Sequence, residues 1–289
     1  MRRRGLLGGL ALLPGAVRAA TCARVTVAAM PLRLIEGFPI VPASIAGRAV
    51  TLVVDTGAQG MLVTPEAAAE LALPLRGMVP MYGTGGGREA RVVLLPGLRL
   101  GGAAMPDLLS PVAPLPVPFS VQPVLAGLLG APLLSRFDLD IDAPGERLSF
   151  FLPANCEPPF RGTVLPLEVS PRQEPFVPVR VNGETLLALL DTGSRGTILG
   201  ESAARRLRLH APVLASPAIG VDGTPQPMGQ ATVRLALGDE APVETPVSVS
   251  ALQLERGDML LGMDAMRRRR VWLGYARGEV LFSPVVPGA

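Results

Sequence analysis

The sequence predicts an all-β protein of two homologous lobes, each with one short helix, related by a pseudo-twofold axis. Two observations predict this fold. The octapeptide Val-Val-Asp-Thr-Gly-Ala-Gln-Gly at 53–60 recurs 136 residues later, at 189–196, as Leu-Leu-Asp-Thr-Gly-Ser-Arg-Gly. Short runs rich in Val and Leu are also interrupted by Gly or Pro roughly every eight to twelve residues, a spacing typical of strands joined by turns.

Residues 1–19 are typical of a secretory signal peptide. Arg2, Arg3 and Arg4 precede a short apolar stretch, and Val17-Arg18-Ala19 provides small residues at a cleavage site. The apolar stretch is too short to cross a bilayer, which needs about 20 residues. Arg3-Arg4 also resembles a twin-arginine signal. We expect an exported protein, periplasmic or secreted, with no stable membrane span; an uncleaved anchor is the alternative.

The signal carries the chain's basic character. The whole chain has a formal charge of +3, and loss of its four signal arginines would leave 23 arginines against 24 acidic residues, or −1. We therefore expect no nucleic-acid partner. The arginine run at 267–270 is interpreted as a solvated loop or the start of a strand. Export would place Cys22 and Cys156 in an oxidising compartment, where they can pair; the sequence leaves their pairing open.

The repeat divides the mature chain into lobes at 27–152 and 160–285, joined by a proline-rich linker. Gly47 and Asn182-Gly183 mark hairpin turns ahead of the two Asp-bearing strands. One helix per lobe is expected, at 65–73 with Thr64 as N-cap and at 201–209. A Leu-Leu-Gly triplet at 128–130 recurs at 260–262, which extends the repeat toward the end of each lobe.

The residue inventory excludes several classes of enzyme. The chain has no lysine, one histidine and two cysteines, so it lacks a P-loop lysine, a Schiff-base lysine and a histidine-rich metal site. A serine or cysteine triad would depend on His210, which lies where a helix is expected to end. Asp138, Asp140 and Asp142 alternate as on a strand with one polar face. We expect no metal and no cofactor.

The two Asp-Thr-Gly turns carry the candidate chemistry. Asp55 and Asp191 follow apolar strands, while Gly57 and Gly193 lack a Cβ and so let backbone approach closely. If the lobes pack about a pseudo-twofold axis, the two carboxyl groups face each other. Because adjacent carboxylates cannot both ionise cheaply, the pair should share one proton. Such a pair can deprotonate a water while it polarises a carbonyl.

These two motifs, each with its Leu-Leu-Gly partner, resemble the aspartic proteases over nearly the whole mature chain. The short lobes and Ala58 resemble the retropepsin-like branch. The resemblance implies two retropepsin-like β-barrel lobes with the active cleft between them and catalytic Asp55 and Asp191. It also implies reciprocal hydrogen bonds of Thr56 and Thr192 under the catalytic pair. A flap is implied at 80–87; its candidate substrate-binding residues are Tyr82, Gly83, Thr84 and Gly85.

The lobes differ at one supporting position. In pepsin-like enzymes a serine follows the first triplet and supports the carboxylate; here Ala58 cannot, while Ser194 can. Which aspartate holds the proton is left open. In the second lobe, residues 219–223 occupy the place of the flap without a tyrosine.

The resulting hypothesis is a monomeric aspartic endopeptidase, an intramolecular pseudo-dimer that hydrolyses an extended peptide or protein at acidic to mildly acidic pH. One alternative is a catalytically inactive peptide-binding module on the same fold. The other is a homodimeric retropepsin-like arrangement, in which each lobe pairs with the same lobe of another chain.

Overall fold

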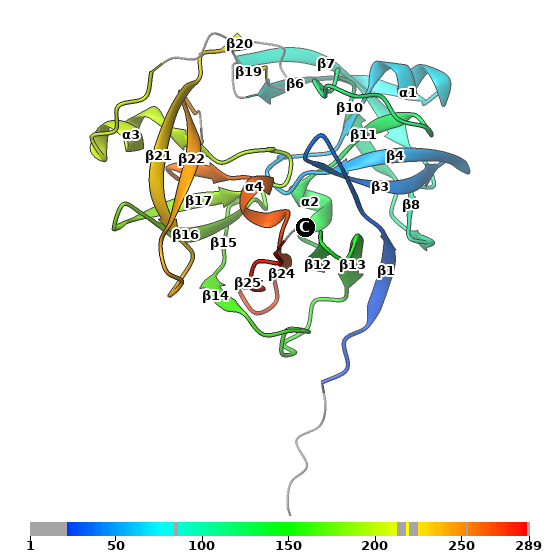
Figure 1. The fold of residues 1–289 in the computed structure, drawn as a ribbon. Helices are drawn as coiled ribbons and strands as arrows, with labels where there is room; N and C mark the ends of the chain where they lie inside the picture. Colours follow the sequence, from blue (N-terminus) through cyan, green and yellow to red (C-terminus); the bar gives the residue numbers. More distant parts are fainter. Residues whose placement is uncertain (1–21, 84–85, 213–217, 220–224, 253, 288–289) are drawn as a thin grey trace, which may run out of the picture.

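The protein consists of two β lobes that share a central sheet (Figure 1). The structure is a computed structural model that describes residues 22–83, 86–212, 218–219, 225–252 and 254–287. The signal peptide predicted at 1–19 lies outside these residues.

The first lobe contains two sheets and two helices. Its larger sheet runs in the order β5-β11-β4-β3-β8-β9, with β2 paired to β3, and its smaller sheet runs β10-β7-β6. The strands are β2 Arg33–Ile35, β3 Phe38–Ile45, β4 Arg48–Val54, β5 Leu62–Val63, β6 Leu75–Gly83, β7 Gly86–Leu95, β8 Arg99–Leu100, β9 Ala103–Ala104, β10 Leu108–Pro111 and β11 Leu125–Leu129, and the helices are α1 Pro65–Glu70 and α2 Ala131–Leu134.

The second lobe repeats this plan and closes into a barrel. Its sheet runs β15-β16-β17-β23-β18-β22-β21, and β21 pairs back onto β16. The elements are β15 Glu168–Val169, β16 Pro175–Val181, β17 Glu184–Leu190, β18 Ile198–Gly200, β19 Ala218–Ile219, β20 Pro225–Gln226, β21 Gly229–Ala236, β22 Val243–Ser250 and β23 Met259–Leu261, with helices α3 Glu201–Arg206 and α4 Met263–Met266. The predicted fold class, a two-lobed β protein with internal repeats, is confirmed.

Tight turns precede both Asp-bearing strands, as predicted. Ala46 and Gly47 join β3 to β4, and Asn182 and Gly183 join β16 to β17. All four residues have positive φ, from 50° to 89°, which is the backbone of the two-residue hairpin turn that matches strand twist.

The predicted helices are present but shorter than expected, and each lobe has a second one. In α1, Thr64 caps the helix by accepting from the Ala67 N–H at 3.3 Å. The helix stops at Glu70 rather than at residue 73 because Ala72 takes a left-handed conformation, and Arg208 plays the same part after α3. The one-turn helices α2 and α4 directly follow the Leu-Leu-Gly triplets. In the described part of the chain, no helix has the length and apolarity needed to cross a membrane.

A six-stranded sheet unites the lobes. It runs in the order β1 Thr26–Pro31, β13 Arg147–Phe151, β12 Asp138–Asp142, β24 Arg270–Gly274, β25 Glu279–Phe282, β14 Thr163–Pro166. Antiparallel pairing of β12 with β24 joins one lobe to the other within a single chain. A disulfide between Cys22 and Cys156, with Cα atoms 5.4 Å apart, ties the segment before β1 to the linker between the lobes.

The polar face predicted for β12 exists, and most of it is buried. Asp138 and Asp140 are buried, and Arg270 at the start of β24 donates to both carboxylate oxygens of Asp140 at 2.8 and 2.6 Å. Arg269 pairs with Glu240. The arginine run at 267–270 therefore begins a strand, as one of its two interpretations held, and two of its guanidinium groups pair within the fold.

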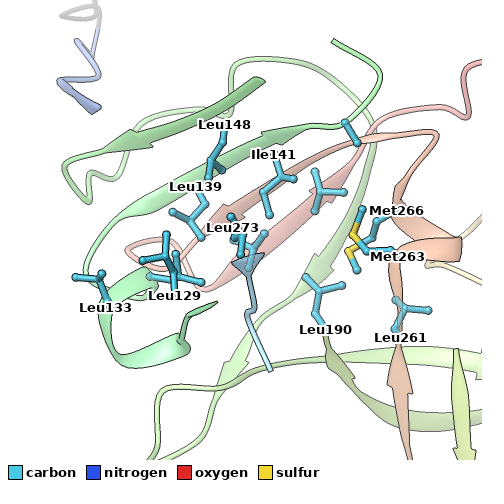
Figure 2. Packing of buried hydrophobic residues seen from close by; sticks show 14 of the residues in the cluster. Leu129, Leu133, Leu139, Ile141, Leu148, Leu190, Leu261, Met263, Met266 and Leu273 are labelled. Atoms are coloured by element: carbon cyan, nitrogen blue, oxygen red, sulfur yellow. The ribbon is translucent and has the colours of Figure 1, made fainter. Parts of the chain in front are cut away.

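The core is one continuous apolar cluster that passes from lobe to lobe across the shared sheet. Figure 2 shows how the side chains of this sheet lie between those of the first lobe and those of the second. The labelled contributors are Leu129 and Leu133 from the first lobe, Leu190, Leu261, Met263 and Met266 from the second, and Leu139, Ile141, Leu148 and Leu273 from the sheet itself. Helices α2 and α4 thus pack on the face of the sheet that is turned toward the two lobes (Figure 1).

Candidate active site

Asp55 and Asp191 each sit one residue past the end of a buried central strand. In the first lobe, β11 runs parallel to β4 with Leu129 beside Val54, and the Asp55 N–H donates to the Leu129 carbonyl at 3.0 Å. In the second lobe, β23 runs parallel to β17 with Leu261 beside Leu190. There the Asp191 N–H donates to the Leu261 carbonyl, also at 3.0 Å. The Leu-Leu-Gly triplets therefore fix where each carboxyl group leaves its strand.

Thr56 and Thr192 link the two turns by four reciprocal hydrogen bonds. The Thr56 hydroxyl donates to the Leu190 carbonyl at 2.5 Å and accepts from the Thr192 N–H at 3.1 Å. The Thr192 hydroxyl donates to the Val54 carbonyl at 2.7 Å and accepts from the Thr56 N–H at 3.0 Å. Both threonines are fully buried, so these bonds hold the turns together without competition from water.

The turns bring the two carboxyl groups into contact. A Cβ built on Gly57 would lie 2.5 Å from Asp191 Cγ, and one on Gly193 would lie 2.3 Å from Asp55 Cγ. Each glycine N–H also donates to the aspartate of its own turn, at 3.1 Å for Gly57 and 2.9 Å for Gly193. The carboxyl groups of Asp55 and Asp191 lie close enough for each to shift the pKa of the other.

The environment of the pair favours a single shared proton. Burial, the charge of Asp191 and the hydrogen bond with Asp191 raise the pKa of Asp55 well above its ordinary value. Burial raises the pKa of Asp191 to about 6, against the opposing effects of the Gly193 N–H, the Asp55 hydrogen bond and the Ser194 N–H. These shifts belong to the coupled pair, which therefore holds one proton at a pH where ordinary carboxyl groups are ionised.

Ser194 contributes through its backbone rather than its hydroxyl. The Ser194 N–H favours ionised Asp191, but the hydroxyl donates to the Gly196 carbonyl at 2.8 Å. The expectation that this hydroxyl supports the carboxylate therefore needs correction. The turn that brings the Ser194 N–H to Asp191 directs the side chain toward Gly196. Asp264 also stabilises this loop, because it accepts a hydrogen bond from the Thr197 hydroxyl at 2.8 Å.

The region predicted as a flap forms a hairpin of β6 and β7. Tyr82 pairs with Gly87 and Gly83 with Gly86; Thr84 and Gly85 lie outside the described residues. Strands β6 and β7 lie on the side of the molecule away from the shared sheet (Figure 1). Most of residues 219–223 in the second lobe also lie outside the described residues.

An apolar cluster flanks Asp55 on the cleft side. Because side chains alternate along a strand, Val53 shares a face of β4 with Asp55. Val53 packs there with Ile40, Leu62 and Leu128, and partly buried apolar residues extend the cluster toward solvent. These include Ile35, Phe38, Ala58, Met81, Leu115, Phe119, Val121 and Leu125. Met81 of the hairpin and Ala58 of the aspartate turn thus belong to one surface.

Two residues at the lobe boundary, Gln59 and Glu174, were not predicted from the sequence. The Gln59 amide donates to Glu174 at 3.1 Å, although the two residues are 115 positions apart. Only the alignment of the repeats could have singled out Glu174, since its counterpart 136 residues earlier is Phe38. His210 is exposed beyond the end of α3. Within the described residues, no group of three or more His, Cys, Asp or Glu side chains is placed to hold a metal ion.

Comparison with known proteins finds a family match in both repeats. A family model described as aspartyl protease matches residues 41–133 and 177–265. Basic 7S globulin from soybean is similar in structure, with a TM-score of 0.50, 15% identity, and coverage of 90% of this chain and 95% of that one. Conglutin gamma, described as a unique basic 7S globulin from lupine seeds, gives a TM-score of 0.52 at 12% identity, covering 91% and 96%. No curated protein matches the sequence significantly.

Proposed function

The chain belongs to the aspartyl protease family, and from that premise we propose that it is an aspartic endopeptidase with Asp55 and Asp191 as its catalytic pair. The observation that carries the proposal is the contact between two buried carboxyl groups from equivalent turns of the two lobes. The family match over both repeats supports it.

The mechanism follows from the unequal protonation of the pair. Ionised Asp191 takes a proton from a water as the water oxygen bonds to the peptide carbonyl carbon, while Asp55 gives its proton to the carbonyl oxygen. The product is a neutral tetrahedral diol. When it collapses, the carbon–nitrogen bond breaks, protonated Asp191 gives its proton to the leaving amine, and ionised Asp55 takes the proton of one hydroxyl as the new carboxyl group forms. Each step moves protons only between the pair and the substrate, so no covalent intermediate or cofactor is needed.

The apolar surface beside Asp55 indicates the substrate. Ala58 and Met81, which are partly buried at the edge of this cluster, would contact a peptide next to its scissile bond, so we propose that the enzyme prefers apolar side chains there. The peptide would lie extended in the cleft between the lobes and bond partly through its main chain to the hairpin of β6 and β7.

Conservative replacement of each aspartate tests the function. Asp55→Asn and Asp191→Asn should each reduce kcat by about 100-fold or more, because an amide neither accepts the water proton nor delivers one to the carbonyl. Cleavage of an unstructured protein such as casein, followed by mass spectrometry, measures this. Asp239→Asn makes the same chemical change on an exposed turn of the second lobe and should leave activity unchanged. Full activity in either catalytic variant would exclude the proposal.

Measurements on the wild-type chain separate the two alternatives. A wild-type chain that binds peptides without cleaving them would indicate a binding module on this fold. A homodimer would be detected by light scattering; we propose a monomer because β12 and β24 already join the lobes within one chain.

We also propose that the protein is exported. The Cys22–Cys156 disulfide supports this, since such bonds persist mainly in oxidising compartments. Export with cleavage after Ala19 would leave Ala20 as the first residue of the mature protein, which N-terminal sequencing checks.

A further inference from the structure

Glu174 is a buried carboxylate for which the proposed mechanism has no role. It is 4% exposed and lies just before β16. Its Oε2 accepts from the Ser170 hydroxyl at 2.8 Å, and its Oε1 accepts from the Gln59 amide of the other lobe at 3.1 Å. A carboxylate is costly to bury, so this set of donors fixes its position at the lobe boundary.

Glu174 lies near the Asp191 turn by strand pairing. Strands β16 and β17 are antiparallel, and their pairing ends with Phe176 beside Leu189. Continued by two residues, the same register would set Glu174 across from Asp191. Opposite residues of an antiparallel pair have Cβ atoms about 5 Å apart and share a face. Gln59, which holds Glu174, stands four residues after Asp55, so the contact links the turn of one aspartate to the chain beside the other.

The equivalent position in the first lobe has no charge. There the register of β3 and β4 places Phe38 opposite Asp55. The Arg195 guanidinium of the second lobe, which occupies the position equivalent to Gln59, lies 5.7 Å from the centre of the Phe38 ring. A carboxylate thus faces Asp191, whereas an aromatic ring with a cation over it faces Asp55.

Few other charges act on Glu174. The Arg172 guanidinium donates to Gln59 from the same turn, but it also pairs with Glu255 at 2.7 Å and is about half exposed. Gln59 thus bonds to both Glu174 and Arg172.

We propose that Glu174 is a positioning residue whose carboxylate, held across the lobe boundary by Gln59, sets the low-pH limit of catalysis through Asp191. The inference rests on the proposed function. The charge of Glu174 raises the pKa of Asp191, so it makes Asp191 take up a proton at higher pH than it otherwise would. Since only ionised Asp191 can accept the proton of water, activity fails at correspondingly higher pH on the acid side.

Glu174→Gln removes the charge while it keeps an oxygen for Gln59. The acid limb of kcat/KM should move to lower pH by about half a unit or more, the order expected for a nearby unit charge at an effective dielectric constant of about 20. Glu174→Asp, which keeps the charge, should restore the wild-type limb. Glu168→Gln, an exposed carboxylate of the same hairpin that pairs with Arg256, is the matched control and should leave the limb in place. An unmoved limb in Glu174→Gln, or an equal shift in the control, would overturn the inference.

A second measurement separates this inference from the proposed function. Carbon-13 NMR of carboxyl-labelled protein, with signals assigned through Asp191→Asn and Glu174→Gln, follows both groups in the wild-type chain without any turnover. In Glu174→Gln the Asp191 signal should titrate at lower pH than in the wild-type chain, because the neighbouring negative charge is gone. An unchanged Asp191 titration in this variant would overturn the inference even if peptides are cleaved. A lowered Asp191 titration in a protein that cleaves nothing would retain it and reject the endopeptidase.

Discussion

At the scale of single residues, the site depends on the absence of a Cβ at Gly57 and Gly193. Each glycine occupies a place where a methyl group would collide with the carboxyl group of the opposite lobe. The absent Cβ is therefore what lets two acidic side chains from different lobes come within hydrogen-bonding distance.

Gly193→Ala tests this requirement directly. The added Cβ would lie 2.3 Å from Asp55 Cγ, so Asp55 must move, and kcat should fall at least about 100-fold while circular dichroism stays unchanged. Gly60→Ala adds the same methyl group where nothing lies within 4 Å and should retain activity. Comparable rates in both variants would show that the turn tolerates displacement of the pair.

The protonation of the pair predicts a pH profile. Catalysis needs ionised Asp191 together with protonated Asp55. Because the pKa of Asp191 is raised to about 6, kcat/KM should rise as the pH passes through about 6. It should fall only at the higher pH where Asp55 loses its proton. Burial thus places the expected optimum in the mildly acidic part of the range predicted from the sequence, or above it. A peptide-cleavage profile with its maximum near pH 4 (about the ordinary carboxyl pKa) would contradict this.

The residues of the pair could be predicted from the sequence, but some of their partners could not. The repeated Asp-Thr-Gly is a local pattern, and it led to Asp55, Asp191 and the threonines. The contacts of Glu174 and the direction of the Ser194 hydroxyl depend on chain that arrives from elsewhere in the fold. Spacing along the sequence carries no signal for either.

At the scale of elements, the aspartate strand and the strands beside it form a tight crossing. Gly127 of β11 has φ of +150°, and a Cβ there would lie 1.7 Å from the Leu62 carbonyl oxygen of β5. The close approach lets β11 pair with β4 on one side and with β5 on the other. This crossing fixes the position of β4, the strand that ends next to Asp55.

Gly127→Ala should therefore unfold or severely destabilise the chain, by more than about 3 kcal/mol, because both strain and a backbone clash must be relieved. Gly77→Ala is the matched control. Gly77 also has positive φ, at +136°, but nothing lies within 4 Å of its built Cβ, so only backbone strain of about 1–3 kcal/mol is expected. Urea unfolding of the two variants measures the difference. Equal losses would mean that strain alone, and not the crossing, governs this position.

The elements followed from the sequence where local signals were strong. Both hairpin turns and the starts of α1 and α3 are where Gly, Asn and the Thr64 cap predicted them. The helix ends were placed too late, because neither Ala72 nor Arg208 is a residue type that signals a left-handed conformation. The helices α2 and α4 were not expected, since a single turn is too short to show a helical period.

At the scale of the whole molecule, the shared sheet converts two repeats into one body. The alternating aspartates of β12 indicated a polar face but not its partner, because Arg270, which bonds to Asp140, arrives from 130 residues away. The repeat predicted that two lobes exist, whereas their joining depends on complementary charges that belong to no repeat. This joining also holds the two Asp-bearing turns in contact.

Arg270→Gln should therefore weaken the whole molecule more than an ordinary surface ion pair would. It leaves Asp140 buried without its two guanidinium bonds and removes the stacking of Arg270 over Phe160. We expect a loss of about 2–3 kcal/mol in the free energy of unfolding, below the full cost of breaking a buried pair because Arg270 is about one third exposed.

Arg48→Gln breaks the Arg48–Glu70 pair, in which both side chains are about half exposed, and should cost under about 1 kcal/mol. Because the sheet joins the lobes, Arg270→Gln should lower activity and stability together, whereas Arg48→Gln should change neither. Separate unfolding transitions for the two lobes in the wild-type protein would show that the sheet does not couple them.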